Sequence, residues 1–197
     1  VDRNDQSALN KFLTNAQWNE AELNKLRLEL LQQFPETQWQ KKGAICIDDV
    51  IAHKTGVYIH GVSKLFDHSE GKFVNGQQLV TTHYVDRKTQ YPLEYRQYYR
   101  KESPEAMGKG FRTKIELAME LVDDAEARRI PAEVYLVDNW FLCKDLTSKI
   151  KSYHKHWIFA VKSNRIITVE NRRISITDYA KQLPLEAHRI LEVEDKK

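Results

Sequence analysis

The sequence has few of the residues that mark disulfide-bonded, fibrous or disordered proteins. Its 197 residues include 2 cysteines, 7 glycines and 5 prolines, whereas hydrophobic residues make up 41%. Cys46 and Cys143 both lie in apolar runs, so we expect reduced thiols in a core and no disulfide framework. A chain of this length buries roughly 70% of its extended surface on folding. The composition therefore favours an ordinary globular domain.

Long apolar runs and several well-known catalytic motifs are also missing. No stretch approaches the roughly 18 apolar residues of a membrane span, and the N-terminus does not resemble a signal peptide. We therefore expect a soluble, cytoplasmic protein. There is no glycine-rich phosphate loop, no Gly-x-Ser-x-Gly elbow and no Cys-His nucleophile pattern, which disfavours ATP use and acyl transfer. Because the first residue is a valine, we expect an excised fragment or a processed form.

The order of the expected elements indicates a mixed α/β fold. A helical lead-in of about 40 residues has Leu23, Leu26, Leu30 and Phe34 at helical spacing, which predicts a packing face. The pattern then changes to extended segments at 44–47, 57–66, 78–84 and 91–99, followed by a loop at 101–110. A helix after Gly110, a strand at 134–137, a helix at 146–153, a strand at 157–161 and a hairpin at 166–176 complete the order. Antiparallel neighbours followed by βα units favour a mixed sheet with helices on its faces.

Two of these apolar strands end in acidic residues. Asp49, with Asp48 beside it, follows the first strand, and Asp138 follows the strand at 134–137. Ligands of α/β sheets gather beyond the carboxyl ends of the strands, and the same motifs offer no obvious lysine or arginine to neutralise these acids. When two carboxylates lie close together, their repulsion raises the pKa of one of them or requires a cation nearby. Carboxylate oxygens are suitable ligands for Mg²⁺ or Mn²⁺. The spacing also fits acids that only cap the following turns, so both interpretations stay open at this point.

Several motifs resemble those of bacterial insertion-sequence transposases. Residues 46–56, Cys-Ile-Asp-Asp-Val-Ile-Ala-His-Lys-Thr-Gly, are similar to the first catalytic motif of that family. Residues 134–141, Val-Tyr-Leu-Val-Asp-Asn-Trp-Phe, are similar to the second, in which an apolar strand ends in an aspartate. Shorter matches at 7–13, 61–62, 91–93 and 111–118 keep the family's order. The resemblance spans nearly the whole chain.

The resemblance implies a ribonuclease H-like core, with a mixed five-stranded sheet and flanking helices, that carries a DDE triad. It assigns Asp49 and Asp138 as catalytic ligands of Mg²⁺ or Mn²⁺. Asp48 is the alternative to Asp49, although alternation along a strand would point it to the opposite face. The implied activity is metal-dependent phosphodiester hydrolysis and strand transfer at transposon ends, in bacterial cytoplasm near the nucleoid. The implied partners are transposon-end and target DNA, with a homodimer in the synaptic complex.

The third acid of the triad is not evident. In the family it follows a β-rich insertion, and the candidates after Asp138 are Glu170, Glu186, Glu192 and Glu194, none of them in a long amphipathic helix. We therefore expect a lead-in at 1–40, a catalytic core at 41–165 and the beginning of an insertion or tail at 166–197. On this interpretation the chain ends before the third acid and is a weak or inactive catalyst alone. The alternatives are a repurposed DNA-binding module and a stand-alone nuclease.

Basic residues are concentrated after the second aspartate. Between 144 and 173 there are eight lysines and arginines and two acids, a local charge of +6, whereas the whole chain carries +3. Such a segment suits a phosphate backbone, although a solvated surface would look the same. Trp140 could stack on a displaced base or belong to the core. The predicted DNA contacts, besides Trp140, are Lys162, Arg165, Lys149, Lys151, Arg112 and Lys114.

Overall fold

The computed structural model describes residues 6–56 and 58–184. The helices are α1 (Gln6–Asn15), α2 (Glu20–Leu31), α3 (Pro104–Lys109), α4 (Lys114–Ala127), α5 (Lys144–Ser152) and α6 (Ile176–Gln182), with a short 3₁₀ helix η1 (Asn139–Phe141). The strands are β1 (Ala44–His53), β2 (Ser63–Asp67), β3 (Lys72–Val85), β4 (Gln90–Tyr98), β5 (Val134–Val137), β6 (His156–Phe159), β7 (Ile166–Val169) and β8 (Arg172–Ser175). Helices and strands follow one another as the sequence predicts, apart from the differences below.

The central sheet is mixed. β4, β3 and β1 are antiparallel neighbours, and β1 is followed by β5 and β6, which run parallel to it. The predicted α/β class with flanking helices and a ribonuclease H-like sheet is confirmed. The sheet has six strands instead of five, because the 14-residue β3 is long enough to pair with β2 near its start and with β4 farther along.

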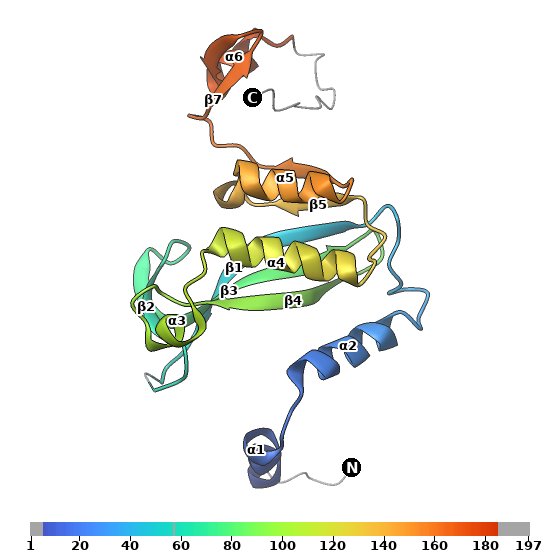
Figure 1. Cartoon of the computed structure of the whole chain (residues 1–197), viewed down its shortest axis with the longest axis vertical. Coiled ribbons are helices and arrows are strands. Elements are labelled where there is room, and N and C mark those ends of the chain that lie inside the picture. Colours follow the sequence, from blue (N-terminus) through green and yellow to red (C-terminus); the bar gives the residue numbers. More distant parts are fainter. Residues whose placement is uncertain (1–5, 57, 185–197) are drawn as a thin grey trace.

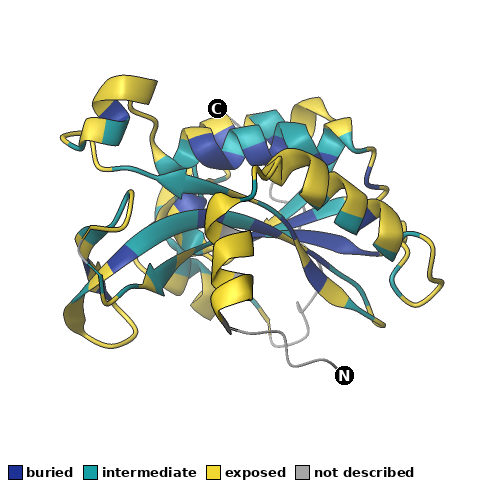
Figure 2. Ribbon diagram, turned by 90° about the horizontal axis from the view of Figure 1, so that it is seen from below, coloured by how far each residue is buried: buried dark blue, intermediate teal, exposed yellow. Residues whose placement is uncertain are grey.

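Helices α4 and α5 pack side by side over the sheet and close the core (Figure 1). Leu121 and Val122 of α4 are fully buried. Figure 2 shows that the helices over the sheet have buried positions on one side and exposed positions on the other. Thr113 begins this helix with a capping box, in which its hydroxyl accepts the Glu116 N–H while the Glu116 carboxylate accepts the Thr113 N–H. A fixed helix start matters for the site, because Lys114 is the first residue of α4.

The prediction that the leucine stripe of α2 forms a packing face is wrong. Leu23, Leu26 and Leu30 are each more than half exposed, whereas Leu28 is buried. The helix is turned this way because the Asn24 amide donates to the Leu93 carbonyl at 2.8 Å, and α2 thereby packs against β4. The apolar stripe consequently faces away from the sheet, and α1 lies farther out (Figure 1).

Other differences concern short segments. The predicted loop 101–110 contains α3, which Ser103 caps. Strands β7 and β8 pair only with each other and form a small separate sheet. Cys46 and Cys143 are free and half-buried. Within the described ranges, no helix is long and apolar enough to cross a membrane. The three-part division at residues 40 and 165 stays a prediction.

Candidate active site

The parallel pairing of β1 with β5 brings the two acidic motifs together. The last paired residues are Ile47 and Val137, so that Asp48 and Asp138 follow at the same level of the sheet. The Asp138 N–H donates to the Ile47 carbonyl at 3.4 Å. One Asp138 carboxylate oxygen accepts the Trp140 N–H at 2.8 Å and so caps η1. The capping interpretation and the ligand interpretation of this acid are therefore compatible, since a carboxylate has further lone pairs.

Asp49 does not end its strand, contrary to the prediction. β1 continues to His53 because β3 pairs with it along its whole length. Side chains alternate along β1, so Asp49 shares the face of the buried Ile45 and Ile47, the face that α4 covers. Asp49 Oδ2 accepts hydrogen bonds from Lys114 Nζ and Gln78 Nε2, both at 2.7 Å.

The Lys114 contact corrects a second expectation. The sequence next to Asp49 and Asp138 offers no obvious lysine or arginine to neutralise them, but α4 supplies Lys114 from 65 residues along the chain. The Lys114 side chain is 15% exposed, and Asp49 is 22% exposed. At such partial burial the ion pair is screened less by water than a surface pair would be.

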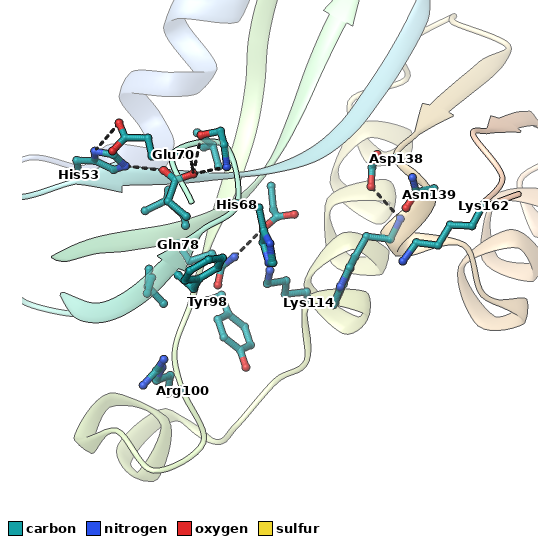
Figure 3. A pocket seen from close by; sticks show the side chains of 18 residues that line it. His53, His68, Glu70, Gln78, Tyr98, Arg100, Lys114, Asp138, Asn139 and Lys162 are labelled. Carbon is teal, nitrogen blue, oxygen red and sulfur yellow. Dashed lines mark hydrogen bonds and ion pairs between the residues drawn. The ribbon is translucent and has the colours of Figure 1, made fainter. Parts of the chain in front are cut away.

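Asp49 and Asp138 line one cleft of about 1060 Å³ (Figure 3). The wall of this cleft also carries Asn139, Trp140, Lys114 and Lys162. It further includes His53, Asp67, His68, Ser69, Glu70 and Arg100. Asn139 and Lys162 lie beside Asp138, whereas His53 and Glu70 lie on the opposite side of the cleft (Figure 3). The cleft thus joins carboxylates to cations, as a site for an anionic ligand and a divalent cation requires.

Asp48 lies on the other face of β1, as alternation predicts. It borders a separate hollow of about 350 Å³ with Asp138, Ile158 and Ala160. Burial, and then the negative charges of Asp49 and Asp138, raise the pKa of Asp48, although its hydrogen bond from the Asp49 N–H opposes this. Asp138 borders both hollows, so it shares one with each aspartate of the first motif.

The structure separates the predicted DNA-contact residues. Lys162, Lys114 and Trp140 line the cleft, and Arg165 donates to the Leu142 carbonyl beside it at 3.4 Å. Lys149 lies on α5, paired with Asp123. Lys151 also lies on α5, with its ammonium 5.6 Å from the centre of the Trp157 ring, and Arg112 pairs with Glu120. Thus only part of the basic set faces the two acids.

Trp140 is half-exposed and is not a core residue. Its ring packs edge-on against the buried Phe141, with 5.0 Å between the ring centres. The Lys114 ammonium lies 4.7 Å from the centre of the same ring. The exposed remainder of the ring stands at the wall of the cleft, where a flat ligand could stack on it.

A second polar cluster in the cleft was not predicted. His53 Nε2 lies 2.7 Å from Asp67 Oδ2, and a carboxylate oxygen of Glu70 lies 3.9 Å from His53 Nδ1. The hydroxyl of Ser69, and next the His53 ring, hold the pKa of Asp67 well below its ordinary value. His53 is part of the first motif, but nothing in the sequence indicates that the β2–β3 turn folds against it. Gln78 is likewise visible only once the register of β3 is known.

The third acid is not located. Glu170 lies in the turn between β7 and β8, and Glu186, Glu192 and Glu194 lie outside the described residues. The donors that β1 and the β5 loop supply are carboxylate oxygens, which suit hard divalent cations such as Mg²⁺ and Mn²⁺. The residues present therefore fit a divalent ion near Asp49 and Asp138.

Comparisons with known proteins give a family match over most of the chain. The sequence model of a family described as DDE superfamily endonuclease matches residues 2–182. A relative from Microchaete diplosiphon, described as "Probable transposase for insertion sequence element IS701", is 27% identical over 175 residues. That alignment covers 88% of this chain and 45% of the relative, so the chain spans less than half of that relative's length.

Among solved structures, the Drosophila P element transposase strand transfer complex is similar at a TM-score of 0.36 and 6% identity. The similarity covers 90% of this chain and 41% of that one. A TM-score of this size is too low to define a shared fold.

Proposed function

Because the chain belongs to the DDE superfamily endonucleases, we propose that its cleft is the DNA-processing centre of a transposase. The resemblance to insertion-sequence DDE transposases is confirmed by the family match and by the IS701 relative. The placing of particular residues in the reaction is the proposal. It is supported by one observation above all: Asp49 from β1 and Asp138 after β5 line the same cleft.

We assign Asp49 and Asp138 as the ligands of a divalent ion, Mg²⁺ or Mn²⁺. Asp49 is preferred to Asp48 because it shares a cleft with Lys114, Lys162 and Trp140, whereas Asp48 borders the smaller hollow on the opposite face. When bound, the ion would supply Lewis-acid neutralisation of phosphate charge. Lys162 would hold the DNA backbone at the rim, and Trp140 would stack against a displaced base.

The proposed reaction is hydrolysis followed by strand transfer. A water oxygen bonds to the phosphorus at the transposon end while the bond from phosphorus to the 3′-oxygen breaks, and that oxygen leaves as a hydroxyl. The new 3′-hydroxyl then attacks a phosphorus of target DNA and displaces the target's 3′-oxygen. Hydrolysis converts one phosphodiester into a phosphomonoester, which carries up to about one more negative charge. Strand transfer exchanges one phosphodiester for another. Negative charge on phosphate oxygens must be neutralised in both steps, so one site can serve both. We further propose that two copies of the protein act together on the DNA, at the bacterial nucleoid.

The metal assignment can be tested without any activity. Fe²⁺ takes oxygen-ligand sites, and with ascorbate and hydrogen peroxide it cuts the polypeptide next to where it is bound. We expect cuts near residues 49 and 138 that Mg²⁺ suppresses, and we expect both to disappear in Asp49→Asn and in Asp138→Asn.

The His53, Asp67 and Glu70 cluster provides the comparison, because one ligand atom from each of these three residues lies within 4.8 Å of the other two. Asp67→Asn should leave the cuts near 49 and 138 unchanged. Cuts confined to the neighbourhood of residues 53, 67 and 70, and lost in Asp67→Asn, would overturn the assignment of Asp49 and Asp138. Cuts near 49 and 138 that persist in Asp49→Asn but vanish in Asp48→Asn would move the first ligand to Asp48.

A further inference from the structure

The ammonium of Lys114 occupies a defined position next to Asp49. Lys114 is the first residue of α4, where the Thr113 capping box fixes the backbone. Its Nζ lies 2.7 Å from Asp49 Oδ2, 4.7 Å from the centre of the Trp140 ring and 5.8 Å from the centre of the Tyr98 ring. The group is thus held by one carboxylate and by the faces of two aromatic rings, which both attract a cation.

This position also connects the two acidic motifs. Asp49 belongs to β1, whereas Trp140 belongs to η1, which Asp138 caps. Lys114 contacts both through its ammonium, so its positive charge lies where β1 and the loop after β5 meet. Among the described residues, Lys114 is the one cation in an ion pair with Asp49.

We propose that Lys114 is a resident counter-ion of Asp49 that competes with a divalent ion and thereby sets the metal affinity of the site. The inference rests on the proposed function, since it takes Asp49 as a metal ligand. Asp49 Oδ2 already accepts two hydrogen bonds, from Lys114 and Gln78, so an incoming cation meets an occupied oxygen. An ammonium and a divalent ion on one carboxylate repel each other, and partial burial limits the screening of that repulsion.

The competition predicts tighter metal binding when the lysine charge is removed. Lys114→Met keeps an unbranched side chain between the two rings but carries no charge. We expect its affinity for Mn²⁺, measured by electron paramagnetic resonance at fixed ionic strength, to rise by about tenfold or more. Lys114→Arg keeps the charge and should remain close to wild type.

Lys64→Met is the matched control. Lys64 also carries its ammonium over an aromatic ring, 5.2 Å from the centre of Phe73, but it is an exposed residue of β2. This variant removes the same charge and the same kind of ring contact, so its Mn²⁺ affinity should equal that of wild type. An equal gain in Lys64→Met would mean that net charge alone is responsible and would overturn the proposal.

A stability measurement separates competition from damage to the fold. Without metal, Lys114→Met leaves Asp49 without its ion pair and should lower the Tm. Saturating Mn²⁺ should then raise the Tm of Lys114→Met by more than it raises that of wild type, because tighter binding stabilises more. Unchanged or weaker Mn²⁺ binding in Lys114→Met, with Asp49-dependent binding intact in wild type, would overturn this inference alone. Absence of Asp49-dependent binding in both proteins would overturn the proposed metal ligands as well.

Discussion

Two lysines of the basic segment 144–173 have different surroundings and should therefore contribute differently to DNA binding. Lys162 is exposed at the wall of the cleft that holds Asp49 and Asp138. Lys149 lies on α5 with its ammonium 2.7 Å from Asp123. The perturbation is the same substitution at each position, Lys162→Gln and Lys149→Gln, and each removes one positive charge.

The expected loss of DNA affinity depends on whether the positive charge of each lysine is already neutralised by a nearby acid. A lysine and a phosphate 4 Å apart in water attract each other by about 1 kcal/mol. Losing that contact at Lys162 should weaken binding roughly fivefold. It should also reduce the slope of log K against log salt by about 0.9. Asp123 already offsets Lys149, so we expect less than about a twofold change there.

The assay is fluorescence anisotropy with labelled duplexes of unrelated sequence, between about 50 and 200 mM salt. EDTA is present, so that metal binding cannot contribute. The loss in Lys162→Gln should be the same for every duplex, because a backbone contact does not read sequence. An equal or larger loss in Lys149→Gln would refute the reasoning and would move the DNA surface to α5.

Three further predictions concern the scaffold around the site. Thr113→Ala removes the capping box of α4 and should lower the free energy of unfolding in urea by about 1 kcal/mol, and an unchanged midpoint would contradict this. Hydrogen bonds keep the pKa of Asp67 low in the folded state, so its carboxylate stabilises the fold above the unfolded-state pKa. The loss of stability caused by Asp67→Asn should therefore be complete above about pH 5 and should fade as the pH falls below about 4. A loss of stability that does not depend on pH would contradict this prediction. Burial raises the pKa of Tyr84 to about 12, and its hydroxyl accepts the Gln40 N–H and donates to Asp86. Tyr84→Phe should therefore cost about 1–3 kcal/mol in thermal unfolding, whereas an unaltered Tm would show that water replaces these bonds.

The parts of the fold that were predictable from sequence are those in which a local pattern determines the outcome. The apolar run 134–137 is β5, and the helix expected after Gly110 is α4, in which Ala118, Val122 and Ala125 are buried on one face. In both segments, burial of one apolar face makes the largest contribution to stability, and the spacing of the apolar residues along the sequence indicates that face directly.

The failures occur where a distant partner overrides the local pattern. The stripe of α2 that includes Leu23 and Leu26 has a helical period, yet hydrogen bonds from Asn24 to β4 turn it away from the sheet. β1 runs past Asp49 because β3 provides a partner strand, although residues 48–53 contain acids and a histidine. The local sequence alone does not show that α2 packs against β4 or that β3 pairs with β1.

The candidate site was predictable in its acids and only partly in its cations. Asp49 and Asp138 stand out because each follows a buried apolar run within a family motif. Lys114 was expected only as a DNA contact, and its pairing with Asp49 depends on how α4 crosses the sheet. A helix crossing is a tertiary property, so the sequence around Lys114 carries no signal of the acid it faces. The +6 segment likewise indicates charge but not that Asp123 neutralises Lys149.

The central claim is that Asp49 and Asp138 hold one divalent ion between them, and a Mn²⁺ titration of a double-mutant cycle tests it most directly. Asp123→Asn on α4 serves as the control for removing a negative charge elsewhere. We expect Asp49→Asn and Asp138→Asn each to weaken Mn²⁺ binding by about tenfold or more, and the double variant to lose little beyond either single one. Wild-type affinity in both single variants, or equal losses in Asp123→Asn, would contradict the account.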